Sequence, residues 1–207
     1  FVLAILTSLS ARAADVIALS TTEFPPYMSA IMPSGGLAVE IATEAFKRSG
    51  YPVKVDYQPW VRALDNAKRG KVTGMVGIWK NKEREQWFVF SNPMFSNQIG
   101  FFKRVKDTIR YKDLHDLKPY TIGIVRGYAN PQAFVNAKLN TDMANDDSSN
   151  LLKLAAGRIN LVLIERGLAN YLIVNRHTQL THRVEWIEPA IGEFPMYIAT
   201  SKQSPDA

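Results

Sequence analysis

Three polar positions follow predicted strands in this sequence, and their side-chain types suit the binding of a small zwitterion. Arg84 comes after a predicted strand at residues 75–78, and its guanidinium can hold a carboxylate through two parallel hydrogen bonds. Gly127 separates a predicted strand from a predicted helix, where free backbone N–H groups attract anions. Glu165 ends the most apolar strand of the second half, where a carboxylate can meet an ammonium group.

Each of these residues also has an ordinary structural interpretation. An arginine in a loop can be solvated and pair with Glu83 or Glu85. Glycine is routinely used in a strand-to-helix turn. Glu165 can form a surface ion pair with the adjacent Arg166. From the residues alone, both interpretations stay open at all three positions.

Aromatic side chains near the same strand ends can wall a small-ligand pocket. These are Phe24, Tyr27, Trp60 and Trp79. Core packing is the alternative, and for Trp60 we expect core packing. Open α/β sheets bind ligands beyond the carboxyl ends of their strands, so a pocket is expected at that edge.

Composition and motifs exclude several other classes of site. The absence of cysteine excludes disulfides, thiol nucleophiles and thiolate metal sites. The three histidines, His115, His177 and His182, lack a ligand-like spacing, so we expect no metal and no cofactor. The formal net charge is +6, but the basic residues are scattered, so we expect no nucleic-acid partner. The sequence contains no phosphate loop, nucleophile elbow or dinucleotide fingerprint.

Strand-like and helix-like segments alternate along the chain, which predicts an α/β fold with mainly parallel sheets flanked by helices. The predicted strands cover residues 16–20, 53–57, 75–78, 98–103, 121–125, 161–164, 184–187 and 196–200. The predicted helices cover residues 36–50, 60–69, 113–117 and 167–175, with one more that Ser148 or Ser149 caps and Ala156 ends.

The first residues are typical of an export signal. An apolar run at residues 1–9 precedes the small-x-small pattern Ala11-Arg12-Ala13. The run is shorter than the roughly 20 residues that a bilayer span needs, so we interpret residues 1–14 as the remnant of a signal peptide. A buried first helix is the alternative. The signal interpretation predicts a periplasmic protein, and we expect the sequence to be truncated at both ends.

In order along the chain, several segments resemble the periplasmic solute-binding proteins that serve polar amino-acid ABC transporters, the bacterial extracellular solute-binding proteins of family 3. The resemblance runs from about Asp15 to Thr200. EFPPY at 23–27 is similar to the first binding loop, and GKVTGM at 70–75 to a helix-to-strand junction. KER at 82–84, with FVFSNPMF at 88–95, matches the segment of the carboxylate-binding arginine. IGIVRGYA at 122–129 resembles the anion-binding turn, and LAAGRINLVLIE at 154–165 the segment that ends in the amine-binding acid.

This resemblance implies a two-lobed, type II periplasmic-binding-protein fold. Lobe 1 would comprise residues 15–102 with a returning strand at 195–207, and lobe 2 residues 103–194. A zwitterion held by both lobes would stabilise the closed form, without chemistry, for delivery to an ABC transporter membrane permease. We expect a monomer. The implied ligand-binding residues are Glu23, Phe24, Tyr27, Trp79, Arg84, Gly127, Tyr128, Ala129 and Glu165.

Several positions depart from the family pattern. Thr73 and Asn160 replace aspartates, and Ala129 stands where a hydroxyl residue often helps to hold the carboxylate. Trp79 occupies a position that is often a small hydroxyl residue, and Glu165 is one methylene longer than the usual aspartate. Together these changes put a standard α-amino acid in doubt and indicate a more aromatic pocket or a different polar ligand.

Two alternatives use the same fold. One is an enzyme that resembles the cyclohexadienyl dehydratases, with Glu23 or Glu165 as the acid, but no second catalytic group is evident. The other is a sensor domain of a membrane receptor. We expect a binding protein and no enzymatic activity.

Overall fold

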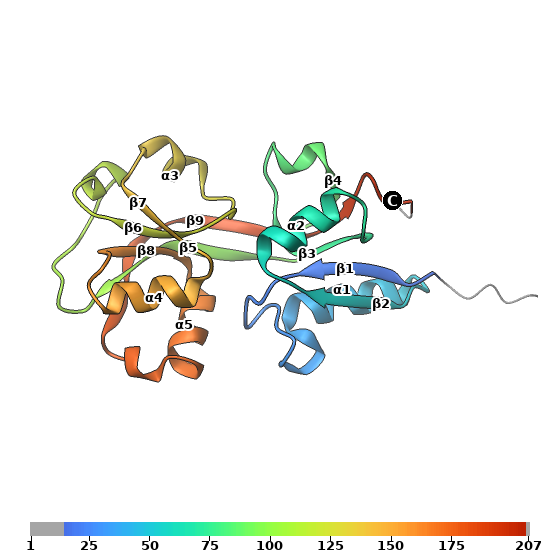
Figure 1. Cartoon of the computed structure of the whole chain (residues 1–207), viewed down its shortest axis with the longest axis horizontal. Helices are drawn as coiled ribbons and strands as arrows, with labels where there is room; N and C mark the ends of the chain where they lie inside the picture. The colour runs from blue at the N-terminus through green and yellow to red at the C-terminus, as the bar shows by residue number, and fades with distance from the viewer. Residues whose placement is uncertain (1–14, 206–207) are drawn as a thin grey trace, which may run out of the picture.

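The computed structural model describes residues 15–205, and Figure 1 shows them as two bodies joined by two long strands. The first lobe contains β1 (Ile17–Thr21), α1 (Leu37–Arg48), β2 (Val53–Tyr57), α2 (Trp60–Lys68), β3 (Gly74–Trp79) and β4 (Phe88–Phe90). The second contains β6 (Ile122–Val125), α3 (Gln132–Ala137), β7 (Thr141–Ala144), α4 (Asp147–Ala155), β8 (Leu161–Glu165) and α5 (Arg166–Asn175). The joining strands are β5 (Phe95–Arg104) and β9 (Val184–Ser201). The predicted signal-peptide remnant at residues 1–14 lies outside the described residues.

The strands form one continuous sheet in the order β2-β1-β3-β9-β5-β8-β6-β7, with β4 paired to β9. Within each lobe the pairing is parallel: β1 pairs with β2 and β3, and β6 pairs with β7 and β8. The joining strands β5 and β9 run antiparallel to their neighbours. The predicted α/β fold is confirmed. The lobe boundaries at residues 102–103 and 194–195 stay predictions.

β9 is one strand of 18 residues, where the sequence pattern predicts two shorter ones. The pattern breaks between them because Pro189 and Gly192 interrupt the apolar residues. β5 nevertheless pairs with β9 on both sides of this break, from Val184 to Ile187 and from Gly192 to Met196, and residues 188–191 lie at the register shift between the two paired segments. Tertiary pairing therefore extends the strand beyond what local sequence indicates.

Short elements are the ones that the sequence pattern misses. It predicts neither β4 nor β7, which have three and four residues and are too short to show a period. The sequence predicts a helix after Gly127 without bounds, and α3 follows there with six residues. The predicted cap of α4 is also wrong. Asp146, not Ser148 or Ser149, is its N-cap, because its carboxylate accepts a hydrogen bond from Ser149 N at 2.7 Å.

The core lies on both faces of the sheet, and its most buried strand is β8. All five β8 residues are buried, because the strand lies between β5 and β6 and is covered by helices. Fully burying one such apolar side chain stabilises a fold by roughly 1.5–3 kcal/mol. In the first lobe, α1 buries Ala38, Val39 and Ala42, which fixes the helix against the sheet.

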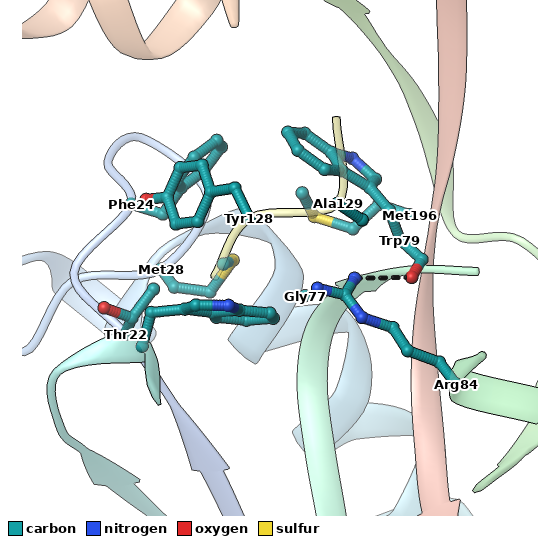
Figure 2. Close-up of a pocket in the computed structure, with 10 residues that line it drawn as sticks. Thr22, Phe24, Met28, Gly77, Trp79, Arg84, Tyr128, Ala129 and Met196 are labelled. Carbon is teal, nitrogen blue, oxygen red and sulfur yellow. Dashed lines mark hydrogen bonds between the residues drawn. The ribbon is translucent and has the colours of Figure 1, made fainter. Parts of the chain in front are cut away.

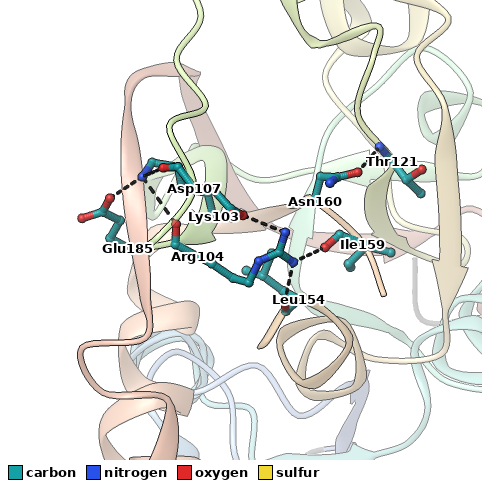
Figure 3. A network of polar contacts seen from close by, with 8 residues as sticks. All are labelled: Lys103, Arg104, Asp107, Thr121, Leu154, Ile159, Asn160 and Glu185. Carbon is teal, nitrogen blue, oxygen red and sulfur yellow. Dashed lines mark hydrogen bonds and ion pairs between the residues drawn. The ribbon is translucent and has the colours of Figure 1, made fainter. Parts of the chain in front are cut away.

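A polar network attaches the second lobe to the end of β5 (Figure 3). Arg104 pairs with Asp107 at 2.7 Å and donates hydrogen bonds to the carbonyl oxygens of Leu154 at 2.9 Å and Ile159 at 2.7 Å. Its side chain is largely buried. One guanidinium therefore holds the end of α4 and the approach to β8 against β5.

Asn160, one of the departures from the family pattern, belongs to the same region. Its side-chain oxygen accepts a hydrogen bond from Thr121 N at 2.9 Å (Figure 3). The residue thus joins the starts of β6 and β8 and serves the fold rather than the pocket. Among residues 15–205, no helix is both long and apolar enough to cross a membrane.

Candidate ligand-binding site

A narrow pocket lies where loops of both lobes meet beyond the carboxyl ends of the strands. Phe24 follows β1, Trp79 ends β3 and Tyr128 follows β6, so three strand ends bring three rings to one place. The space between the side chains is about 300 Å³, including its opening to solvent. Figure 2 shows the Arg84 guanidinium pointing into it.

Arg84 is the charged group of this pocket. It begins the short 3-10 helix η2 (Arg84–Gln86), is 4% exposed, and donates a hydrogen bond from Nη1 to the Trp79 carbonyl oxygen at 2.7 Å. Its guanidinium carbon lies 4.9 Å from the centre of the Trp60 ring. Burial lowers the pKa of Arg84 to about 10, so the group stays protonated at neutral pH. Within residues 15–205 no acidic side chain pairs with it, which leaves a buried cation facing the pocket.

Three rings form walls that meet at steep angles, and we call Phe24, Trp79 and Tyr128 the aromatic box. Phe24 and Trp79 have centroids 6.0 Å apart and planes at 87°. Trp79 and Tyr128 are 6.3 Å apart at 84°, and Phe24 and Tyr128 are 6.3 Å apart at 61°. Figure 2 shows Phe24 and Tyr128 beside each other, with Met28 close to both. Edge-to-face packing fixes the rings relative to one another.

Trp60 packs in the core of the first lobe, as the sequence predicts, and it also lines the same pocket. It is 9% exposed, contacts Tyr128 at 5.8 Å between ring centroids, and donates a hydrogen bond from Nε1 to the Gly127 carbonyl oxygen at 2.7 Å. This bond joins the two lobes. Gly127 has a φ of 75°, which favours glycine, and Ala129 lies two residues further along the same wall.

Glu165 lies beside the pocket as the N-cap of α5. Its carboxylate accepts hydrogen bonds from Gly167 N at 3.0 Å, Leu168 N at 2.6 Å and the Tyr27 hydroxyl at 3.2 Å. Burial raises the pKa of Glu165, while these hydrogen bonds oppose the rise. Burial and the nearby carboxylate together raise the pKa of Tyr27 to about 12. Glu165 also lines a second, enclosed space behind the aromatic box.

Glu23 is exposed and lies outside the pocket, at a broad groove between the lobes. Its carboxylate accepts a hydrogen bond from Ala30 N at 2.9 Å and pairs with Arg176 at 3.5 Å. The structure therefore brings five of the nine predicted site residues into one pocket and places the other four around it. The five are Phe24, Trp79, Arg84, Tyr128 and Ala129, and the four are Glu23, Tyr27, Gly127 and Glu165.

Asp147 is a buried acid near the site, and nothing in the sequence pattern singles it out. It is 6% exposed, and its Oδ2 accepts a hydrogen bond from the Tyr128 hydroxyl at 3.0 Å. Burial raises the pKa of Asp147 to about 7, and the nearby Asp146 and Glu165 add to the rise. Asp146 is the N-cap of α4 and Asp147 is its first residue. Acidic residues are common at the start of a helix, so the sequence gives no sign that Asp147 is buried beside the pocket.

The other lining residues are small or apolar and carry no sequence signal of their own: Thr22, Met28, Gly77 and Met196. Gly77 has a φ of 79° and lies at a register shift between β3 and β9, which turns the end of β3 toward the pocket. No group of side chains within residues 15–205 is arranged to hold a metal ion.

The comparisons with known proteins agree with this geometry. The family model for bacterial extracellular solute-binding proteins, family 3, matches residues 6–194. A search of curated proteins finds no match.

Solved structures share the fold at low sequence identity. The arginine-bound form of truncated ArgBP from T. maritima has a TM-score of 0.76 at 18% identity, over 92% of this chain and 90% of that one. The GluR0 ligand-binding core from Nostoc punctiforme, in complex with L-glutamate, has 0.77 at 18%, over 91% and 86%. A histidine kinase sensor domain with similarity to periplasmic binding proteins has 0.78 at 19%, over 94% and 86%. The fold is that of the type II periplasmic binding proteins.

Proposed function

Because the chain belongs to family 3 of the bacterial extracellular solute-binding proteins, we propose that it captures a small carboxylate ligand between its lobes for an ABC transporter. The observation that carries this proposal is the buried Arg84 guanidinium, which faces the pocket without an acidic partner among the described residues. A buried charge is costly unless it is paired, so the site favours an anionic group. A carboxylate matches the planar donors of arginine through two parallel hydrogen bonds.

Capture would work by closure of the two lobes at the predicted boundaries. Arg84 belongs to the first lobe, whereas Tyr128 and Ala129 belong to the second. A ligand that contacts both sets of residues binds the closed form better than the open form, so binding shifts the population toward closure. No bond is made or broken in this cycle. The proposed location is the periplasm.

Substitution of Arg84 tests the proposal. The chain is first screened by thermal shift against amino acids, other small carboxylates and polyamines. A hit is expected only among compounds that carry a carboxylate, and none among the polyamines. Arg84→Ala is then expected to weaken binding of that hit by roughly 2–4 kcal/mol, measured by calorimetry. Arg84→Lys should recover only part of the loss, because an ammonium lacks the planar pair of donors.

The matched control is Arg62→Ala, which removes an exposed arginine from α2. This variant should bind like the wild type. Wild-type affinity in Arg84→Ala, or a hit that lacks an anionic group, would refute the proposal.

A sensor role is the second candidate, because a histidine kinase sensor domain shares the fold. Both roles begin with the same capture step and differ in what the closed form contacts. Uptake of the labelled ligand by cells that lack the gene distinguishes them. Reduced uptake supports delivery to a transporter, whereas normal uptake with a lost transcriptional response supports a sensor.

A further inference from the structure

The pocket separates positive and negative charge across its length. Arg84 provides the positive end and packs on Trp60. At the other end, Asp147 and Glu165 line the enclosed space behind the aromatic box, together with Phe24, Trp79 and Tyr128. Within residues 15–205 neither acid pairs with a basic side chain, and burial raises the pKa of both, so a cation beside them would stabilise their charged forms. A ligand in this field is stabilised if its anionic end points to Arg84 and a cationic end to the box.

The two acids of the negative end line the space behind the aromatic box and not the pocket itself, and three of their oxygens already accept hydrogen bonds. Both oxygens of Glu165 accept bonds from the start of α5, and one also accepts from Tyr27. Oδ2 of Asp147 accepts the Tyr128 hydroxyl bond from behind the ring. None of the residues that line the pocket itself is acidic. An ammonium group with N–H donors would therefore lose its hydrogen bonds to water and find few replacements.

An ammonium group without N–H donors avoids this cost. Methylated ammonium groups bind to the faces of aromatic rings, through the electrostatic attraction of the ring quadrupole and through apolar contact. The aromatic box supplies three such rings at steep angles to one another, while Trp60 contacts the arginine. Ala129 adds a methyl group where a polar side chain would offer a hydrogen bond.

From this arrangement we propose that the ligand is a betaine: a small carboxylate whose ammonium nitrogen carries methyl groups in place of hydrogens. The proposal rests on the proposed function and narrows it to one substrate class. The carboxylate binds Arg84, and the methylated nitrogen lies in the aromatic box, with the Asp147 and Glu165 carboxylates behind it. A neutral apolar carboxylate would fill the same space but gain nothing from those two charges.

Calorimetric titration of the intact chain with three matched probes tests this. Glycine betaine carries both features, glycine replaces the methyl groups with hydrogens, and 3,3-dimethylbutanoate has the same shape with a neutral carbon in place of the nitrogen. Glycine betaine is expected to bind at least about tenfold more tightly than either of the others. Equal or tighter binding of glycine overturns the inference and leaves the proposed function standing. Equal binding of 3,3-dimethylbutanoate also overturns it, since charge would then play no part.

A pair of tryptophan variants tests whether the affinity for glycine betaine depends on the aromatic box. Trp79→Leu removes one wall of the aromatic box and should lower the affinity for glycine betaine by about tenfold or more. Trp87→Leu makes the same change outside the pocket, where Lys68 covers the ring, and should leave the affinity unchanged. Circular dichroism and melting curves confirm that both variants fold. Failure of all three probes overturns the betaine inference, while a different carboxylate that binds through Arg84 would preserve the proposed function.

Discussion

The two buried acids beside the pocket differ in what they do for the fold. Glu165 caps α5 with both of its oxygens, so its removal would leave backbone N–H groups without partners. Asp147 has one side-chain partner, the Tyr128 hydroxyl, and sits near two other carboxylates. Glu165 therefore contributes directly to helix stability, whereas the charge on Asp147 opposes folding and is available to respond to a ligand.

This difference gives a prediction about pH. The folded-state pKa of Asp147 is about 7, above its ordinary 3.8, so the folded protein binds more protons than the unfolded chain between these values. Stability should therefore fall as pH rises through that window. We expect Asp147→Asn to make the fall in melting temperature between about pH 5 and pH 8 shallower. The raised pKa of Glu165 acts in the same direction, so part of the fall remains.

The control for this variant is Glu40→Gln, which makes the same acid-to-amide change at an exposed position on α1. Its melting temperatures should follow the wild-type dependence on pH. Identical slopes in Asp147→Asn and the wild type would contradict the assignment of the buried charge.

At the residue scale, the sequence could identify those site residues whose side-chain type and place after a strand already indicate a binding role. Arg84 stands out because a guanidinium near a strand end has an obvious use. Asp147 does not, because its burial depends on Tyr128 folding over it from another segment. Trp60 suits a core as well as a pocket, and only its bond to Gly127 places it at the junction of the lobes.

Among the helices and strands, α1 positions the loop that carries Phe24 and Tyr27 through the backbone conformation of its N-cap residue. Gly36 is its N-cap, with φ 92° and ψ 168°, a backbone conformation that is essentially restricted to glycine. A Cβ atom at this position would lie 2.7 Å from the Tyr27 carbonyl oxygen. The start of the helix is therefore packed directly against the loop that carries Phe24 and Tyr27.

Two glycine variants separate strain from contact. Gly50→Ala, at φ 87° with open space around it, should lower the free energy of unfolding by about 1–2 kcal/mol through strain alone. Gly36→Ala should cost more, because the Tyr27 backbone must also move, and should weaken ligand binding by displacing Phe24. Urea unfolding and calorimetry measure both effects. An equal loss of unfolding free energy in the two variants would mean that the loop at Tyr27 moves aside at no measurable energetic cost.

The elements that sequence predicts well are the longer, regular ones. Both flanking glycines of α1 and the apolar run of β8 are visible in the sequence. The pattern misses β4 and β7, because a few residues cannot show a period, and it divides β9 at Pro189. Only the neighbouring strand β5 reveals that β9 is continuous.

At the scale of the whole molecule, the lobes meet through the packing of Tyr128 against three rings of the first lobe and through a few polar contacts between described residues. The Trp60 indole donates to the Gly127 carbonyl oxygen, Tyr27 donates to Glu165, and Arg176 pairs with Glu23. Such contacts are each worth about 1 kcal/mol, so the closed arrangement is a balance that a ligand can shift.

Removal of one contact should shift this balance. Trp60→Phe keeps a ring beside Arg84 but loses the donor to Gly127, so we expect a larger radius of gyration by small-angle X-ray scattering without ligand. Ligand affinity should fall by about fivefold, which corresponds to one hydrogen bond. Trp87→Phe is the control, because that ring lies away from the junction. An unchanged radius of gyration in Trp60→Phe would show that the bond does not hold the lobes together.

The continuity of β9 also affects how the protein is made. β3 and β5 both pair with β9, so each has an unpaired edge until the ribosome has synthesised residues 184–201. Neither lobe can therefore complete its sheet before these residues are synthesised, and pairing between segments so distant in the chain is slow. Exposed strand edges attract other chains. The nascent protein should thus depend on chaperones until β9 emerges and pairs with strands of both lobes.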